Sequence, residues 1–208
     1  MAKRAIPVKA LFLGDMSPLV KFLVVADTIF YAGMGLLGPI FALFIVEFID
    51  GGTAAVAGIA AAVFLITKSL FQIPIATVID RICGERDDFT VLFIGIIITS
   101  LIPLAYLFIT TPMQLYLVQF ILGVATASMF PSFMAIFTRH TKPGTEGLSW
   151  GVYYTFIDLS AAAAAAIGGF LAYTIGFEAV IFIVATLGII ASLMYLPAIE
   201  YLKTCELK

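Results

Sequence analysis

The chain has 208 residues, of which 62% are hydrophobic and 12% charged, and its formal net charge is −2. Soluble globular domains carry about 45–50% apolar and about 25% charged residues, so this composition lacks the polar side chains that a water-facing surface needs. It excludes a soluble enzyme, a disordered protein and a nucleic-acid-binding protein, since no basic stretch is present to contact phosphates. The chain is therefore predicted to be a membrane protein.

Six apolar segments are long enough to cross a bilayer, whose hydrocarbon core of about 30 Å takes about 20 helical residues. Because backbone polar groups in lipid must be satisfied within the segment, each is predicted to be a helix, and the fold class to be all-α. In chain order the predicted spans are residues 19–46, 53–79, 89–109, 113–137, 148–175 and 177–195. Gly38 and Pro39 in the first span mark a place where helices bend or approach one another closely.

Ten of the eleven Lys and Arg residues lie on one side of this arrangement, and the three loops on the other side contain none. Basic residues are retained on the cytoplasmic side, so both termini are predicted to be cytoplasmic in a multi-pass protein of the cell membrane. The predicted organisation is a cytoplasmic N-terminal segment (1–18), a transmembrane domain (19–199) and a cytoplasmic tail (200–208). Cys83 and Cys205 then lie where thiols stay reduced.

Three ionisable side chains, Asp27, Lys68 and Asp158, lie deep within predicted spans. Each costs roughly 2.5–3.5 kcal/mol at a helix centre, so such groups normally face a bundle interior or a wet cavity. Helical spacing places each on a stripe of polar, aromatic or small residues. The stripes are Asp27, Tyr31, Gly35 and Gly38; Ala61, Phe64, Lys68 and Gln72; Gln119, Gly123 and Thr126; and Trp150, Tyr154, Asp158, Ala161 and Ala165. The first, second, fourth and fifth spans are predicted to share a polar face, and the third and sixth to face lipid.

The stripes supply candidate functional residues. Asp27, Asp158 and Lys68 are candidates for proton or ion coupling, because a carboxylate removed from water can take up and release a proton. Aromatic rings beside such a carboxylate suit an amphiphilic solute or a cation. The candidates for substrate contact are Tyr31, Gln119, Trp150, Tyr153 and Tyr154. Structural ion pairs and plain aromatic packing are the alternatives for these two groups.

The segment from Gln72-Ile73-Pro74 to residues 80–86, Asp-Arg-Ile-Cys-Gly-Glu-Arg, resembles the cytoplasmic signature of the major facilitator superfamily. Ala76 stands where that signature has its first glycine. Residues 119–147 and 151–169 resemble two further segments of the family. Gln119 stands where the family commonly has an arginine to which proton coupling is often attributed.

This resemblance implies one six-helix half of such a transporter, built as a 3+3 inverted repeat. It implies secondary active transport of a small molecule by alternating access, with Asp80, Arg81 and Arg86 in a gating loop. Complete members have two halves related by an axis along the membrane normal. The implied partner is therefore a second copy in a parallel homodimer, joined through the second and fifth spans.

Depth along the helices predicts one contact in that dimer. Lys68 lies about 18 Å from Asp80, and Asp158 about 16.5 Å from Gly147, at 1.5 Å per residue. The two charges are thus expected to pair between copies. The rival predictions are a pair within one subunit and a pair of Lys68 with Asp27, which has no evident partner at its own depth.

Two other classes of function remain open. One is a non-transporting half that docks onto a different membrane protein or acts as a sensor. The other is an intramembrane enzyme with two aspartates sharing a proton, although neither aspartate has the expected glycine-flanked motif and the single histidine, His140, excludes a His-x-x-x-His zinc motif. No catalytic residue, metal or cofactor is predicted; the expected partners are the second copy, a small-molecule substrate and the lipid bilayer, without nucleic acid.

Overall fold

The computed structural model describes residues 13–14, 16–81 and 84–202. Within these residues six helical segments are long and apolar enough to cross a membrane, and no strand is present, which confirms the all-α membrane class. Cys83 and Cys205 lie outside the described residues. The helices are α1 (Pro18–Leu37), α2 (Phe41–Phe48), α3 (Ala54–Arg81), α4 (Glu85–Ala105), α5 (Pro112–Arg139), α6 (Glu146–Ile175) and α7 (Phe177–Tyr195).

The first span consists of two helices. α1 ends at Leu37, and a 3₁₀ turn over Gly38–Ile40 joins it to α2. Pro39 lies in this turn, where its missing N–H and fixed ring interrupt the hydrogen-bond ladder of an α-helix. The segment predicted over residues 19–46 is thus divided at the predicted bend, whereas the other five spans begin and end within four residues of the helices observed.

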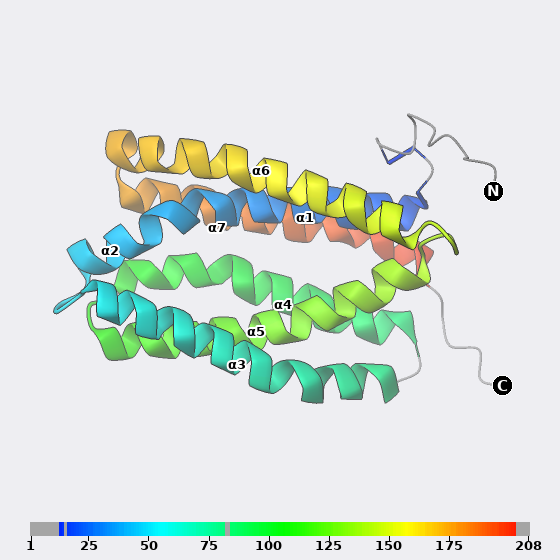
Figure 1. The fold of residues 1–208 in the computed structure, drawn as a ribbon, viewed down its shortest axis with the longest axis horizontal. Coiled ribbons are helices and arrows are strands. Elements are labelled where there is room, and N and C mark those ends of the chain that lie inside the picture. The colour runs from blue at the N-terminus through cyan, green and yellow to red at the C-terminus, as the bar shows by residue number, and fades with distance from the viewer. Residues whose placement is uncertain (1–12, 15, 82–83, 203–208) are drawn as a thin grey trace.

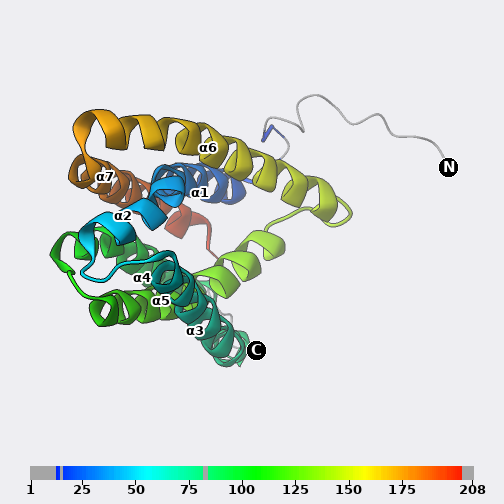
Figure 2. The same cartoon turned by 60° about the vertical axis from the view of Figure 1, so that its left-hand side comes forward.

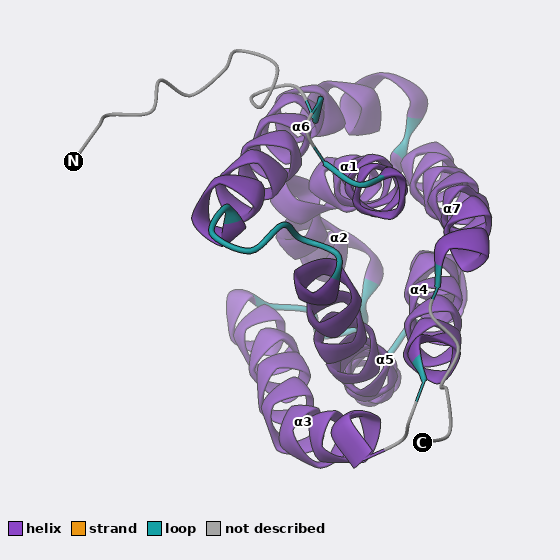
Figure 3. Ribbon diagram, turned by 90° about the vertical axis from the view of Figure 1, so that its right-hand side faces the viewer, coloured by secondary structure: helices purple, strands orange, loops and turns teal. Residues whose placement is uncertain are grey.

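The six spans form an arc. Consecutive contacts join α6 to α1, α1 to α7, α7 to α4, α4 to α5 and α5 to α3. Viewed end-on, the open side of the arc lies between α6 and α3 (Figure 3). α1 begins and α7 ends at the same end of the bundle (Figure 1).

The packing repeats between the first three and the last three spans. α3 and α4 pack against α5, and α6 and α7 pack in the same way against α1, so each packed group of three takes spans from both halves of the chain. α4 meets α7 between the two groups. Figure 2 separates these groups, with α1, α6 and α7 on one side and α3, α4 and α5 on the other. Because three spans reverse the direction of the chain across the membrane, the repeats are inverted, as the family resemblance implied.

α4 and α7 join the two groups as well as presenting apolar side chains outward. Ile94 and Phe182 are exposed on them, as expected of lipid-facing helices. Their inner sides are closely packed, since a Cβ at Gly188 of α7 would overlap the side chain of Ser100 of α4. These two spans, predicted to face lipid, therefore also hold the two groups of helices together.

α1 and α6 approach so closely that only glycine fits at Gly168, where a Cβ would overlap the backbone of Leu36. We expect Gly168→Val to force the two helices apart and to destabilise the protein by about 1–3 kcal/mol, the usual cost of overpacking. The neighbouring Gly169 faces open space, so Gly169→Val is the matched control. Thermal unfolding of both variants in detergent checks this, and equal stabilities would contradict it.

Candidate functional site

A buried carboxylate lies where α1, α6 and α7 meet. Asp27 of α1 is 3% exposed. One of its oxygens accepts a hydrogen bond of 2.7 Å from the Tyr153 hydroxyl of α6, and the other accepts one from the Tyr195 hydroxyl of α7. No basic side chain pairs with Asp27 among the described residues. From the sequence alone Asp27 had no evident partner at its own depth, whereas in the structure two phenols donate to it.

Tyr153 was a predicted substrate contact, but its buried hydroxyl is bonded to Asp27. The other aromatic candidates lie around it. Trp150 packs against Phe137 of α5 with ring centroids 4.3 Å apart, and Tyr154 lies 6.0 Å from Trp150. Tyr31 of α1 packs against the buried cluster that contains Tyr153. Trp150 and Tyr153 therefore lie on the side of α6 that faces α5, and the ring of Tyr154 lies beside them.

Lys68 of α3 is half-buried, and its ammonium lies 5.2 Å from the centre of the Phe130 ring of α5. This distance is within the range of a cation–π interaction. Asp158 of α6 is exposed. The ion pairs formed among the described residues include neither group. The two rival predictions, a Lys68–Asp158 pair within one subunit and a Lys68–Asp27 pair, are thus not realised in this chain.

Gln119 lies beside the break between α1 and α2. Its side-chain N–H donates a 3.3 Å hydrogen bond to the hydroxyl of Tyr106, and both side chains are buried. The pair borders a cavity of about 240 Å³ whose other walls are mostly apolar, including Phe41 and Phe64. An apolar pocket with a few convergent polar groups is the usual form of a small-molecule site.

The predicted gating residues Asp80, Arg81 and Arg86 are exposed and form no ion pair within the described part of the chain. Instead, the first turn of α4 is bonded to the end of α5. Arg139 donates to Asp88, and His140 Nε2 lies 2.9 Å from Glu85 Oε2. Neither pair was predicted from the sequence. Together they fix the ends of α4 and α5 to one another.

Asp88 is 1% exposed, and one of its oxygens has no hydrogen-bond partner. Removing Arg139 would leave a buried charge unpaired. We expect Arg139→Gln to lower the free energy of unfolding by about 1–3 kcal/mol, the usual cost of an unsatisfied buried group. Arg86→Gln is the control at an exposed arginine. Denaturant unfolding compares them, and a similar small loss for both would show that the Asp88–Arg139 pair adds no stability.

The fold is a bundle of six potential membrane spans in two inverted repeats of three. Residues 23–203 match the sequence profile of the Major Facilitator Superfamily, and the chain belongs to this family.

Its relatives include the multidrug resistance protein MdtG of Klebsiella pneumoniae (strain 342), 26% identical over 88% of this chain and 44% of that protein. MdtG of Escherichia coli (strain K12 / DH10B) is 27% identical over 80% of this chain and 40% of its own length. The chain thus spans less than half the length of these curated relatives. The crystal structure of the POT family transporter PepTSo superimposes with a TM-score of 0.73 over 91% of this chain and 39% of that one, at 15% identity, which shows the shared fold.

Proposed function

We propose that this chain is one half of a secondary active transporter that moves a small amphiphilic molecule across the cell membrane by alternating access. The observation that carries the proposal is the set of polar groups on α3, α5 and α6, namely Lys68, Gln119 and Asp158. Ionisable groups at this depth normally face a cavity, a substrate or other protein. Membership of the family favours a transporter over an intramembrane enzyme.

The substrate is proposed to contact two parts of the inner face. Tyr31, Trp150 and Tyr154 form an aromatic surface on the α1–α6 side, which suits an apolar or cationic group. Gln119 offers a hydrogen bond in the mostly apolar cavity on the α1–α3–α5 side. The relatives named as multidrug resistance proteins support an amphiphilic substrate.

We propose that a second copy covers the open side of the arc between α3 and α6. The two copies would form a parallel homodimer with cytoplasmic termini. α3 and α6, at the ends of the arc, are the least buried long helices. Three of the 28 residues of α3 and six of the 30 of α6 are buried, against twelve of the 28 of α5. A two-fold axis along the membrane normal places α3 of one copy against α6 of the other. The exposed Asp80, Arg81 and Arg86 would then face the second copy at the gate.

Proton coupling is assigned to Asp27 in this proposal. Burying a charged carboxylate with no cation beside it costs more free energy than burying the neutral acid. Tyr153 and Tyr195 offset that cost by donating to the charged form. Uptake of a proton would weaken these two bonds, and so couples protonation to the contact between α1, α6 and α7.

The test is flux of an amphiphilic fluorescent dye into vesicles that contain only the purified chain, under an imposed pH gradient. We expect gradient-driven dye movement and a dimer mass in native detergent. Flux that requires a different membrane protein would favour the alternative, a heterodimerising half. Absence of flux in both preparations would reject transport.

A further inference from the structure

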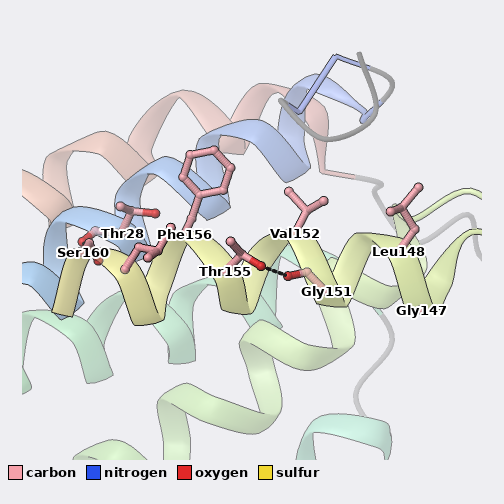
Figure 4. A pocket seen from close by; sticks show the side chains of 9 residues that line it. Thr28, Gly147, Leu148, Gly151, Val152, Thr155, Phe156 and Ser160 are labelled. Carbon is pink, nitrogen blue, oxygen red and sulfur yellow. Dashed lines mark hydrogen bonds between the residues drawn. The ribbon is translucent and has the colours of Figure 1, made fainter. Parts of the chain in front are cut away.

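A groove of about 720 Å³ runs along α6 beside Thr28 of α1. Its walls include Thr28 of α1 and Gly151, Val152, Phe156 and Ser160 of α6. Figure 4 shows Val152 and Phe156 projecting from α6 toward α1 and α7, away from α5. Val152 lies about 200° around the helix from Tyr154, so this wall of the groove faces away from Tyr154, whereas Gly147 and Gly151 lie within about 60° of it.

The hydroxyl groups that line the groove are already used within the bundle. Thr28 Oγ1 donates to the carbonyl of Val24 at 2.7 Å, and Thr155 Oγ1 donates to that of Gly151 at 2.7 Å (Figure 4). Ser160 Oγ lies 2.8 Å from the carbonyl of Ile157. Along most of its length the groove therefore presents an apolar surface, and its occupant must be apolar to match.

The length of the groove fits one leaflet of a bilayer. From Gly147 to Ser160 the helix rises about 19.5 Å, whereas half of the hydrocarbon core is about 15 Å. The groove thus reaches from the membrane surface, at the end where α6 begins, to about the midplane. A straight apolar chain that enters from that surface would fill it.

A cation lies near the surface end. Lys21, in the first turn of α1, is seven residues before Thr28 and therefore on the same face of the helix, two turns closer to the surface. It is half-buried, and its ammonium lies 3.5 Å from the carbonyl oxygen of Gly14. A basic group at headgroup depth attracts anionic lipids.

We propose that this groove binds one acyl chain of an anionic phospholipid from the leaflet on the side of Pro18, with the lipid phosphate on Lys21. The occupant is a lipid rather than the second copy, because the groove spans one leaflet and has the Lys21 cation near its surface end. The site requires neither transport nor dimerisation.

Native mass spectrometry of the protein from micelles with equal phosphatidylglycerol and phosphatidylethanolamine tests the acyl-chain part. Gly151 lines the groove and has open space at its Cβ position, so Gly151→Leu places a bulky apolar side chain in the groove. We expect at least a tenfold loss of bound lipid, whereas Gly169→Leu, on the same helix outside the groove, retains it. Gly147→Leu, also at an open position, repeats the test if Gly151→Leu unfolds. Lipid retention by the groove-filling variant that folds would overturn the proposal.

The headgroup part has its own variant. Lys21→Gln is expected to reduce the preference for phosphatidylglycerol about fivefold, the effect of one basic residue near an anionic surface. Lys142→Gln, at an exposed lysine between α5 and α6, is expected to keep the preference. An unchanged preference in Lys21→Gln would overturn the assignment of the phosphate to Lys21.

Discussion

Asp27→Asn is expected to abolish transport driven by a pH gradient while leaving the protein folded. The amide has the size of the carboxylic acid and can still hydrogen-bond to the hydroxyls of Tyr153 and Tyr195, but it does not take up or release a proton. If Asp27 couples proton movement to transport, the variant should still exchange dye between equal concentrations and fail to accumulate it against a gradient. Dye accumulation and dye exchange in the same vesicles measure these two activities separately.

Asp50→Asn is the matched control, because Asp50 is an exposed carboxylate in the loop between α2 and α3. It should accumulate dye at the wild-type rate. Tyr195→Phe removes one of the two donors to Asp27 and is expected to change the pH at which accumulation is half-maximal without abolishing it. Wild-type accumulation by Asp27→Asn would remove Asp27 from the coupling mechanism.

The spans could be predicted from sequence because hydropathy is a local property of the chain. A run of about 20 apolar residues must be helical in lipid whatever its neighbours are. The division of the first span depends on Gly38 and Pro39, which are also local signals. The helix ends needed the structure, since the charged first turn of α4 (Glu85, Asp88) continues the helix beyond the apolar residues from which the span was predicted.

The partners of the charged groups could not be predicted in the same way. Asp27 and Tyr195 are 168 residues apart, and Asp88 and Arg139 are 51 apart. A single sequence does not state which helices are neighbours, so it gives depth along a helix but not the residue across from it. Tyr195 also ends the sixth span, where tyrosine commonly marks the membrane interface. Its role at Asp27 therefore had no distinct signal.

Depth does predict a contact between copies, and the helix bounds refine it. Lys68 lies 13 residues from Arg81, the end of α3, and Asp158 lies 12 residues from Glu146, the start of α6. These separations are about 19.5 Å and 18 Å from the same side of the membrane. Within one chain, Lys68 has the Phe130 ring beside its ammonium, and Asp158 is exposed. In the proposed dimer, Lys68 of each copy meets Asp158 of the other.

Lys68→Ala and Asp158→Ala are each expected to weaken the dimer strongly, because breaking a buried pair costs about 3–5 kcal/mol when the surviving charge stays unpaired. Exchanging the two residues within one chain should partly restore association. Sedimentation equilibrium in detergent measures the dimer dissociation constant. Lys142→Ala, at an exposed lysine, is the control and should leave that constant unchanged.

Mixing the two single variants tests whether the pair forms between copies. A Lys68→Ala copy keeps Asp158, and an Asp158→Ala copy keeps Lys68, so their mixed dimer contains one intact pair and one site with neither charge. It should therefore associate more tightly than either variant does alone, because it has no unpaired charge. A pair within one subunit gives no such recovery. Mixed dimers no tighter than the two variants, or crosslinks formed only through α4 and α7, would refute the contact between α3 and α6.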